Sequence, residues 1–391
     1  MISKMELRPH IPELTLGPLT STELDTVQYW GFFNQDEISG EAGRLLMLDI
    51  DFGRECSLKC PTCFRRFNPV DDSEDPDLTC QELLDVICEA RKLGLKTVKI
   101  CGAGEPFENP DLLGFARRLS DWDVGLSIFT KGHVLGDDLL AARFFGQEGV
   151  KNSRYLATLL FELKTSLLVN FQSFKPEVQD RLVGNIKGHT VRRNRAVEIL
   201  AEIGFNKCSP TRLAFCMNPI TRENYDGLFD IYTYCRERNI LPVIATLMLS
   251  GKQFNRQFLA GVDVSDEEKI SLYTKIYEYN IEHGIQSLSA VLEEGVSPMP
   301  GIHVCNQIAT GLYITLKGNV VMCPGDSSRI LGNIRKTQLS EIWTRSDNYK
   351  RRGTFNCDCP PKAGKTIPAN LYSSVLKNLR EKYESSVYNT A

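Results

Sequence analysis

Short apolar runs alternate with longer amphipathic segments over the first two thirds of the chain. Helical periodicity separates the apolar runs, for example at 80–93, 112–120, 191–203 and 222–238. Strands alternating with helices of this length predict βαβ units and a parallel sheet, and six units suit an open, partial (β/α)6 TIM-like barrel. The six predicted strands are 45–51, 97–101, 124–130, 166–173, 212–217 and 242–247.

The remaining segments predict a smaller second domain. Glycine and proline gather at 295–301 and mark a boundary. Beyond it, β-rich runs at 311–315 and 319–323 flank a turn that contains Gly318, which is a hairpin signature. We predict four parts: an irregular lead-in (1–43), the partial barrel (44–295), a small α+β domain containing the hairpin (296–364), and a C-terminal helix and tail (365–391).

Composition excludes several classes of protein. The 391 residues carry a formal net charge of −3, and a pI near 6.1 argues against general nucleic-acid binding. No apolar run approaches the ~20 residues of a membrane-spanning helix. The first 14 residues have no apolar core of a secretory signal. We therefore expect a cytoplasmic protein with neither a membrane nor a nucleic-acid partner.

The cysteines are the candidate functional residues, because clustered thiols in a reducing compartment usually bind metals or act in catalysis. Cys56, Cys60 and Cys63 stand in CSLKCPTC, directly after the first predicted strand. Zinc usually takes four protein ligands, whereas three thiolates suit a [4Fe–4S] cluster with one open iron. A zinc knuckle or three unrelated thiols remain the alternatives. A loop after a barrel strand faces the mouth, where active sites of such barrels lie.

A second motif follows the second predicted strand. Gly102, Ala103, Gly104 and Glu105 precede Pro106 there. Unpaired carbonyls at a strand end and a carboxylate both favour a cation, although an ordinary strand-to-helix turn has the same composition.

Together these motifs resemble the radical S-adenosylmethionine (radical SAM) superfamily, with its CxxxCxxC and GGEP signatures. The resemblance implies that the three cysteines hold a [4Fe–4S] cluster whose open iron binds SAM. One electron, from an external donor such as flavodoxin or ferredoxin, would then release a 5′-deoxyadenosyl radical that takes a substrate hydrogen. It also implies a set of SAM-binding residues on the strand ends: Gly102, Gly104, Glu105, Thr130, Ser173 and Asn218. The chain departs from the family at Thr62, where an aromatic residue is common, and at Ala103, which separates the two glycines.

A second cysteine cluster lies in the C-terminal part of the chain. Cys305 and Cys323 flank the hairpin, and Cys357 and Cys359 follow it. Four thiolates without histidine allow zinc or a [4Fe–4S] cluster. The segment resembles the SPASM/twitch extensions of radical SAM enzymes, which implies one auxiliary [4Fe–4S] cluster and leaves open whether Cys359 is its fourth ligand.

The resemblance indicates hydrogen abstraction from a small sugar, aminocyclitol or nucleoside in natural-product biosynthesis, with dehydrogenation or epimerisation as the outcome. The lead-in is short for a peptide-binding domain, but a peptide-modifying maturase stays an alternative, as does a non-catalytic Fe–S redox sensor or electron carrier. Cys216 lies within the fifth predicted strand, where alternate residues face the barrel interior. Its thiol is a candidate hydrogen-atom donor, and simple core packing is the other interpretation.

Overall fold

The computed structural model describes residues 6–14, 26–31, 33–65, 74–248, 256–302, 305–325, 329–350 and 359–388. Their strands form one nine-stranded sheet in the order β6-β5-β4-β3-β2-β1-β7-β8-β9, whose ends do not pair with each other. The six parallel strands predicted from the sequence are all present, so the partial-barrel fold is confirmed. The strands are β1 (Met47–Ile50), β2 (Thr97–Ile100), β3 (Gly125–Thr130), β4 (Thr165–Asn170), β5 (Leu213–Cys216), β6 (Leu241–Val243), β7 (Gly311–Ile314), β8 (Asn319–Val321) and β9 (Gly332–Asn333).

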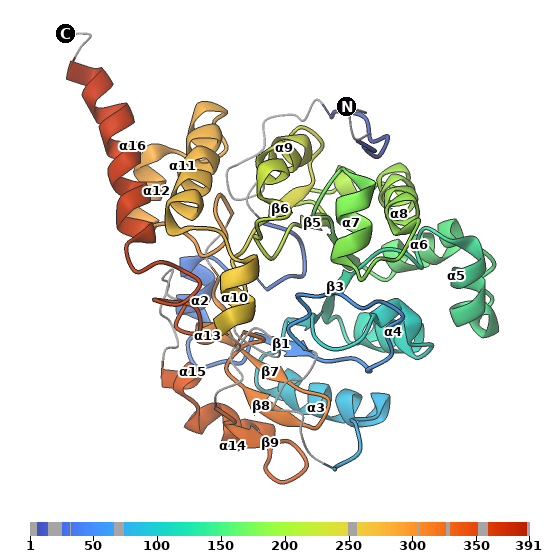
Figure 1. Cartoon of the computed structure of the whole chain (residues 1–391). Helices are drawn as coiled ribbons and strands as arrows, with labels where there is room; N and C mark the ends of the chain where they lie inside the picture. The colour runs from blue at the N-terminus through green and yellow to red at the C-terminus, as the bar shows by residue number, and fades with distance from the viewer. Residues whose placement is uncertain are drawn as a thin grey trace.

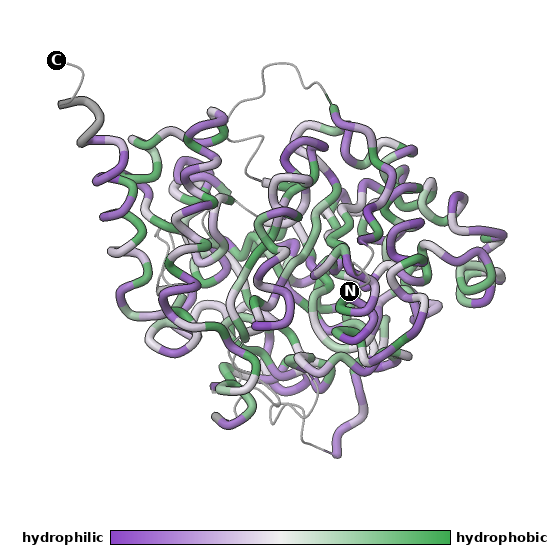
Figure 2. Tube along the Cα trace, turned by 45° about the horizontal axis from the view of Figure 1, so that its top comes forward, coloured by the Kyte–Doolittle hydropathy of each residue, from purple (hydrophilic) through white to green (hydrophobic). Residues whose placement is uncertain are grey.

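Helices surround this sheet, as Figure 1 shows. Polar and apolar positions alternate along the helices while the strands are largely apolar, as expected for a sheet buried beneath amphipathic helices (Figure 2). The α-helices are α2 (Gln35–Gly40), α3 (Cys80–Lys92), α4 (Leu112–Asp121), α5 (Asp138–Phe145), α6 (Ser153–Glu162), α7 (Pro176–Leu182), α8 (His189–Ile203), α9 (Tyr225–Arg236), α10 (Arg256–Val262), α11 (Asp266–Glu282), α12 (Leu288–Glu294), α13 (Gln307–Thr310), α14 (Leu339–Arg345), α15 (Asp347–Lys350) and α16 (Leu371–Tyr388).

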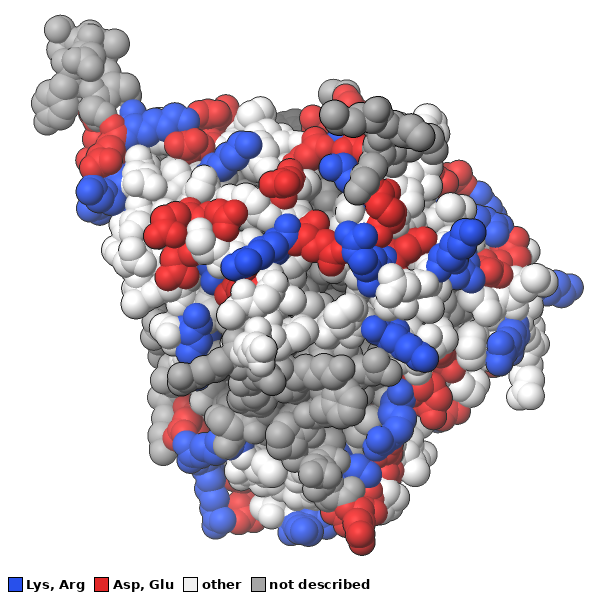
Figure 3. Space-filling model, viewed as in Figure 1, with Lys and Arg blue, Asp and Glu red and all other residues white. Residues whose placement is uncertain are grey.

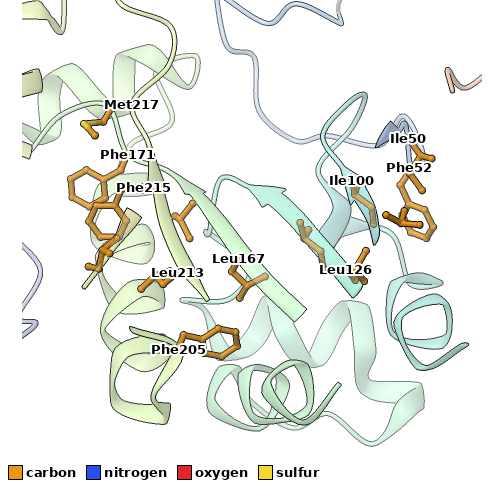
Figure 4. Packing of buried hydrophobic residues seen from close by; sticks show 14 of the residues in the cluster. Ile50, Phe52, Ile100, Leu126, Leu167, Phe171, Phe205, Leu213, Phe215 and Met217 are labelled. Atoms are coloured by element: carbon orange, nitrogen blue, oxygen red, sulfur yellow. The ribbon is translucent and has the colours of Figure 1, made fainter. Parts of the chain in front are cut away.

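The two faces of the sheet have different surroundings. On β5, Leu213 and Phe215 belong to the large core beneath the helices, whereas Ala214 and Cys216 belong to a small apolar cluster inside the barrel. Figure 4 shows side chains of the large core, among them the stacked rings of Phe171 and Phe215. The inner face is therefore the one available to a ligand.

The predicted lead-in is more structured than its prolines suggest. It contains α2, and residues 27–30 lie across the amino ends of the strands. Tyr29 O accepts a hydrogen bond from the Thr97 hydroxyl, and Gln28 O accepts one from the Ser166 hydroxyl at 2.6 Å. Trp30 joins the cluster inside the barrel. The segment thus closes the barrel at the end opposite the strand carboxyl termini.

The predicted hairpin is confirmed as β7 and β8, with Gly318 in the left-handed region at φ +78°. Its position in the fold was not predicted. β7 pairs in parallel with β1, with Met47 opposite Gly311, so the hairpin extends the barrel sheet. The boundary at 296 stays a prediction, but hydrogen bonds of a shared sheet cross it.

The predicted C-terminal helix is α16, which lies beside α11 (Figure 1). Lys382 forms ion pairs with Glu278 and Glu282 across this contact. Charges of both signs are interspersed on the face shown in Figure 3. Within the described residues, no helix combines the length and apolar character needed to cross a membrane.

Candidate active site

A cavity of about 710 Å³ opens at the carboxyl ends of the parallel strands. Three segments form its wall: the cysteine loop after β1, the glycine-rich turn after β2, and the ends of β3 to β6. Among the predicted site residues, its lining includes Cys56, Cys60, Cys63, Gly102, Gly104, Glu105, Thr130, Cys216 and Asn218. The fold therefore brings together most of the residues that the sequence singled out.

The cysteine loop is held by a buried carboxylate. Glu108 accepts hydrogen bonds from Ser57 N at 2.8 Å and from the Ser57 hydroxyl at 2.6 Å. His133 Nε2 lies 2.8 Å from the same carboxylate. Burial opposes the charge of Glu108, but the hydrogen bonds from His133 and Ser57 prevail and lower its pKa. Farther along the loop, Lys59 N donates to Val183 O at 3.1 Å.

Asp51, directly after β1, joins three segments of the site. Its carboxylate accepts hydrogen bonds from Ala103 N at 2.5 Å, from Leu316 N at 3.0 Å and from the Tyr313 hydroxyl. It also forms a buried bidentate ion pair with Arg65, just beyond Cys63. Sequence reasoning missed this residue, although an acidic residue ending a buried apolar strand was a visible signal.

The glycine-rich turn depends on close backbone contacts. A Cβ on Gly102 would overlap the Asp51 carboxylate. Gly104 has φ +77°, and a Cβ there would lie 2.6 Å from the Gly53 carbonyl oxygen. Both positions require glycine for the turn to approach the cysteine loop this closely.

Glu105 and Thr130 form one buried unit on the cavity wall. The Thr130 hydroxyl donates to Glu105 Oε1 at 2.5 Å, and Lys131 N donates to Oε2 at 2.8 Å. The Thr130 side chain therefore orients the carboxylate. Lys131 also lines the cavity, and it forms no ion pair within the described part of the chain.

The end of β4 differs from the prediction. The strand ends at Asn170, and Ser173 is not among the cavity-lining residues; its hydroxyl accepts a hydrogen bond from Lys175 N at 3.0 Å. Asn170 and Gln172 line the cavity instead. Gln179 accepts from Gln172 N at 2.8 Å and so supports this turn from behind.

Cys216 is the last residue of β5 and not a mid-strand residue. Its side chain lies on the inner face, is 2% exposed, and borders the cavity. Burial raises the pKa of the thiol, which keeps it protonated. Asn170 Nδ2 donates to Cys216 O at 3.3 Å and holds β4 and β5 together here.

The second cysteine group adjoins the same cavity. A Cβ on Gly325 would lie 3.7 Å from Cys323 Sγ and 3.9 Å from the side chain of Met248, which lines the cavity. Cys305, Cys323 and Cys359 all act electrostatically on one buried lysine, Lys362. Cys357 lies outside the described residues.

The two cysteine groups contain the donor atoms that would bind a metal ion or an iron–sulfur cluster. Within the described ranges, no three Cys, His, Asp or Glu side chains converge on a point that suits a single metal ion. Iron–sulfur clusters are held by cysteine thiolates. Both groups contain only thiol donors, with no histidine, which fits iron–sulfur clusters.

Comparison with known proteins supports this chemistry. Residues 305–364 match the SPASM iron–sulfur cluster-binding domain. A probable GTP 3′,8-cyclase from Pyrococcus horikoshii is 36% identical over 323 residues, which cover 78% of this chain and 94% of that protein. A PqqA peptide cyclase from Streptomyces rochei is 38% identical over 73 residues, covering 18% of this chain and 19% of that protein.

Solved structures share the fold. SuiB from Streptococcus suis, bound to the precursor peptide SuiA, matches with a TM-score of 0.54 and 16% identity, over 80% of this chain and 67% of that chain. The protein anSMEcpe, with bound AdoMet and Kp18Cys peptide, matches with a TM-score of 0.58 and 12% identity, over 88% of this chain and 99% of that chain. The chain is thus a SAM-binding [4Fe–4S] protein with an auxiliary cluster, and it belongs to the radical SAM superfamily, in the group with a C-terminal SPASM domain.

Proposed function

We propose that this enzyme abstracts a hydrogen atom from a small polar substrate of the sugar, aminocyclitol or nucleoside class and dehydrogenates or epimerises it. One observation carries the proposal: the cysteine loop, the glycine-rich turn and the polar ends of β4 and β5 line a single cavity. This cavity of about 710 Å³ has to hold the SAM-binding cluster and SAM as well as the substrate, which favours a small substrate.

Cys56, Cys60 and Cys63 are the proposed ligands of the SAM-binding cluster. When bound and reduced, this cluster with SAM supplies the 5′-deoxyadenosyl radical that takes the substrate hydrogen. Glu108 holds the loop through Ser57.

The proposed SAM-binding residues on the second strand end are Gly102, Gly104 and Glu105. Glu105 presents its carboxylate to the SAM ammonium, while Thr130 orients that carboxylate. Asn218 lies on the same cavity wall. Ser173 does not line the cavity, so Asn170 and Gln172 replace it as candidates for the ribose.

The SPASM segment supplies the proposed auxiliary ligands, Cys305, Cys323, Cys357 and Cys359. Its position beside Met248, on the cavity wall, suits a group that accepts an electron from a substrate radical or anchors the substrate.

Cys216 is the proposed hydrogen-atom donor for an epimerisation outcome. Its protonated thiol borders the cavity on the inner face of the barrel. Donation from a thiol to a substrate radical transfers one hydrogen atom and leaves a thiyl radical, which the external one-electron donor and a proton restore. Cys216→Ala is then expected to retain SAM cleavage and lose incorporation of solvent deuterium into the product.

The likeness to the probable GTP 3′,8-cyclase favours a nucleoside-type substrate. A peptide is the second candidate, because a PqqA peptide cyclase is among the relatives and the SuiB structure contains a precursor peptide. Incubation of the enzyme with deuterium-labelled nucleosides, nucleotides or peptides distinguishes the two substrate classes. Deuterium appears in 5′-deoxyadenosine only with the class that donates the abstracted hydrogen.

The reaction class is tested by cleavage of SAM to 5′-deoxyadenosine in anaerobically reconstituted, dithionite-reduced protein. Cys60→Ala is expected to abolish cleavage, and Cys88→Ala, which changes an exposed cysteine on α3, to leave it unchanged. Iron content is expected to fall from about eight to about four per chain in the Cys56/Cys60/Cys63→Ala triple variant. Full cleavage by Cys60→Ala would overturn the ligand assignment, and absence of cleavage by the wild type would favour a non-catalytic Fe–S protein.

A further inference from the structure

A buried lysine lies beside Cys359, one of the auxiliary cysteines. Lys362, three residues after Cys359, is 6% exposed. Its Nζ donates to Thr246 O at 2.9 Å, and its backbone N donates to Cys359 O at 2.9 Å. Ile367 N donates to Lys362 O at 3.1 Å, so both the ammonium and the backbone of this residue are fixed.

The auxiliary cysteines lie close enough to Lys362 to interact with its charge. Burial lowers the pKa of its ammonium, and the thiols of Cys359, Cys323 and Cys305 act in the opposite direction. No carboxylate forms an ion pair with it in the described part of the chain. A buried charge is costly without a counter-charge, and an iron–sulfur cluster held by these thiolates would supply one.

Lys362 also connects this group to the cavity. Thr246, which accepts its hydrogen bond, follows β6 and lines the cavity. The Thr246 hydroxyl lies 3.3 Å from that of Thr366, which donates to Leu247 O at 2.8 Å. Lys362 is therefore hydrogen-bonded to Cys359 through its backbone and to the cavity wall through its ammonium.

We propose that Lys362 is a positioning residue that sets the reduction potential of the auxiliary cluster. Four thiolates around an iron–sulfur core carry net negative charge, which increases by one when the core takes up an electron. In a site of low dielectric constant, a fixed positive charge stabilises the reduced form more than the oxidised form. Lys362 thereby makes the auxiliary site a better electron acceptor. The inference rests on the ligand assignment proposed above.

The test is an EPR-monitored redox titration of full-length protein that carries the Cys56/Cys60/Cys63→Ala changes, so that the auxiliary cluster is the iron centre observed. Lys362→Met is expected to lower the ratio of reduced to oxidised cluster at a given potential by about tenfold, equivalent to about 59 mV for one electron. Lys362→Arg retains the charge and is expected to keep the wild-type midpoint. The matched control is Lys365→Met, which changes an exposed lysine in the same loop.

An unchanged midpoint in Lys362→Met, or a shift equal to that of Lys365→Met, overturns the inference and leaves the ligand assignment standing. If Lys362→Met takes up no iron, Lys362→Gln, whose amide can still donate to Thr246 O, is titrated in its place. Loss of iron from both neutral variants but not from Lys362→Arg supports the need for the charge. If the triple variant with Lys362 intact holds no cluster, the ligand assignment and this inference fail together.

Discussion

Replacing Asp51 with Asn is expected to weaken the junction of the three segments that this residue joins. The carboxylate and the Arg65 side chain are 0% and 3% exposed. The groups that contact Asp51 are hydrogen-bond donors: Arg65 and the Tyr313 hydroxyl, with the backbone N–H groups of Ala103 and Leu316. The side-chain NH2 group of an asparagine at position 51 is a donor. Whichever way the amide is turned, this group would face another donor, and the hydrogen bonds made by that carboxylate oxygen would be lost.

The magnitude follows from the burial of this ion pair. Removing one partner of a buried pair costs about 3–5 kcal/mol. Unfolding entropy of about 2.1 cal/mol/K per residue amounts to about 0.8 kcal/mol/K for a chain of 391 residues. Asp51→Asn should therefore lower Tm by about 4–6 °C.

The assay is differential scanning calorimetry of cluster-loaded protein at one scan rate. The control, Glu202→Gln, breaks the ion pair with Arg154, whose two side chains are 57% and 59% exposed; it should cost at most about 1 kcal/mol, or about 1 °C. Arg65→Met should cost less in the Asp51→Asn background than in the wild type, because the two residues are coupled. A melting temperature within a degree of the wild type, or fully additive effects, would refute this reasoning.

Three further predictions concern the cysteine loop, the ion pair between Glu82 of α3 and Arg335 beyond β9, and the glycine-rich turn. Glu108→Gln weakens the support of the cysteine loop and should lower cluster affinity by about 10–100-fold, measured by the rate of iron loss to a chelator; an unchanged rate contradicts it. The hydrogen bond from Arg335 lowers the pKa of Glu82 from 4.5 to about 2. The stabilisation of the folded protein by this ion pair is therefore present above pH 4.5 and lost as the pH falls toward 2. Melting temperatures of wild type and Glu82→Gln should converge over that range, and a constant difference would contradict this. Gly104→Ala, with its Cβ against the Gly53 carbonyl and its positive φ, should cost about 1–3 kcal/mol and weaken SAM binding, measured by equilibrium dialysis beside the open-space control variant Gly114→Ala.

Much of the site was visible in the sequence because its signals are local. The spacing of Cys56, Cys60 and Cys63, and the glycines of the turn after β2, are short-range patterns that follow predicted strands. Because the carboxyl ends of parallel strands meet at one edge of a sheet, these patterns also predicted that the residues would share a cavity. The predicted strand end at Ser173 was wrong, because β4 ends three residues earlier than its apolar run suggested; the register of the turn could not be taken from composition.

The sequence by itself determined the class of elements and the chemistry. Alternating apolar runs specified six parallel strands, Gly318 specified the hairpin turn, and cysteine spacing marked two metal sites, which the family resemblance identified as iron–sulfur sites. Only the tertiary structure decided how these parts join: β7 pairs with β1, Asp51 contacts residues more than 260 positions away, and Lys362 reaches Thr246 across 116 positions. The reason is physical. Local patterns depend on neighbours along the chain, whereas a buried carboxylate or ammonium is satisfied by whichever partners the packed fold brings to it.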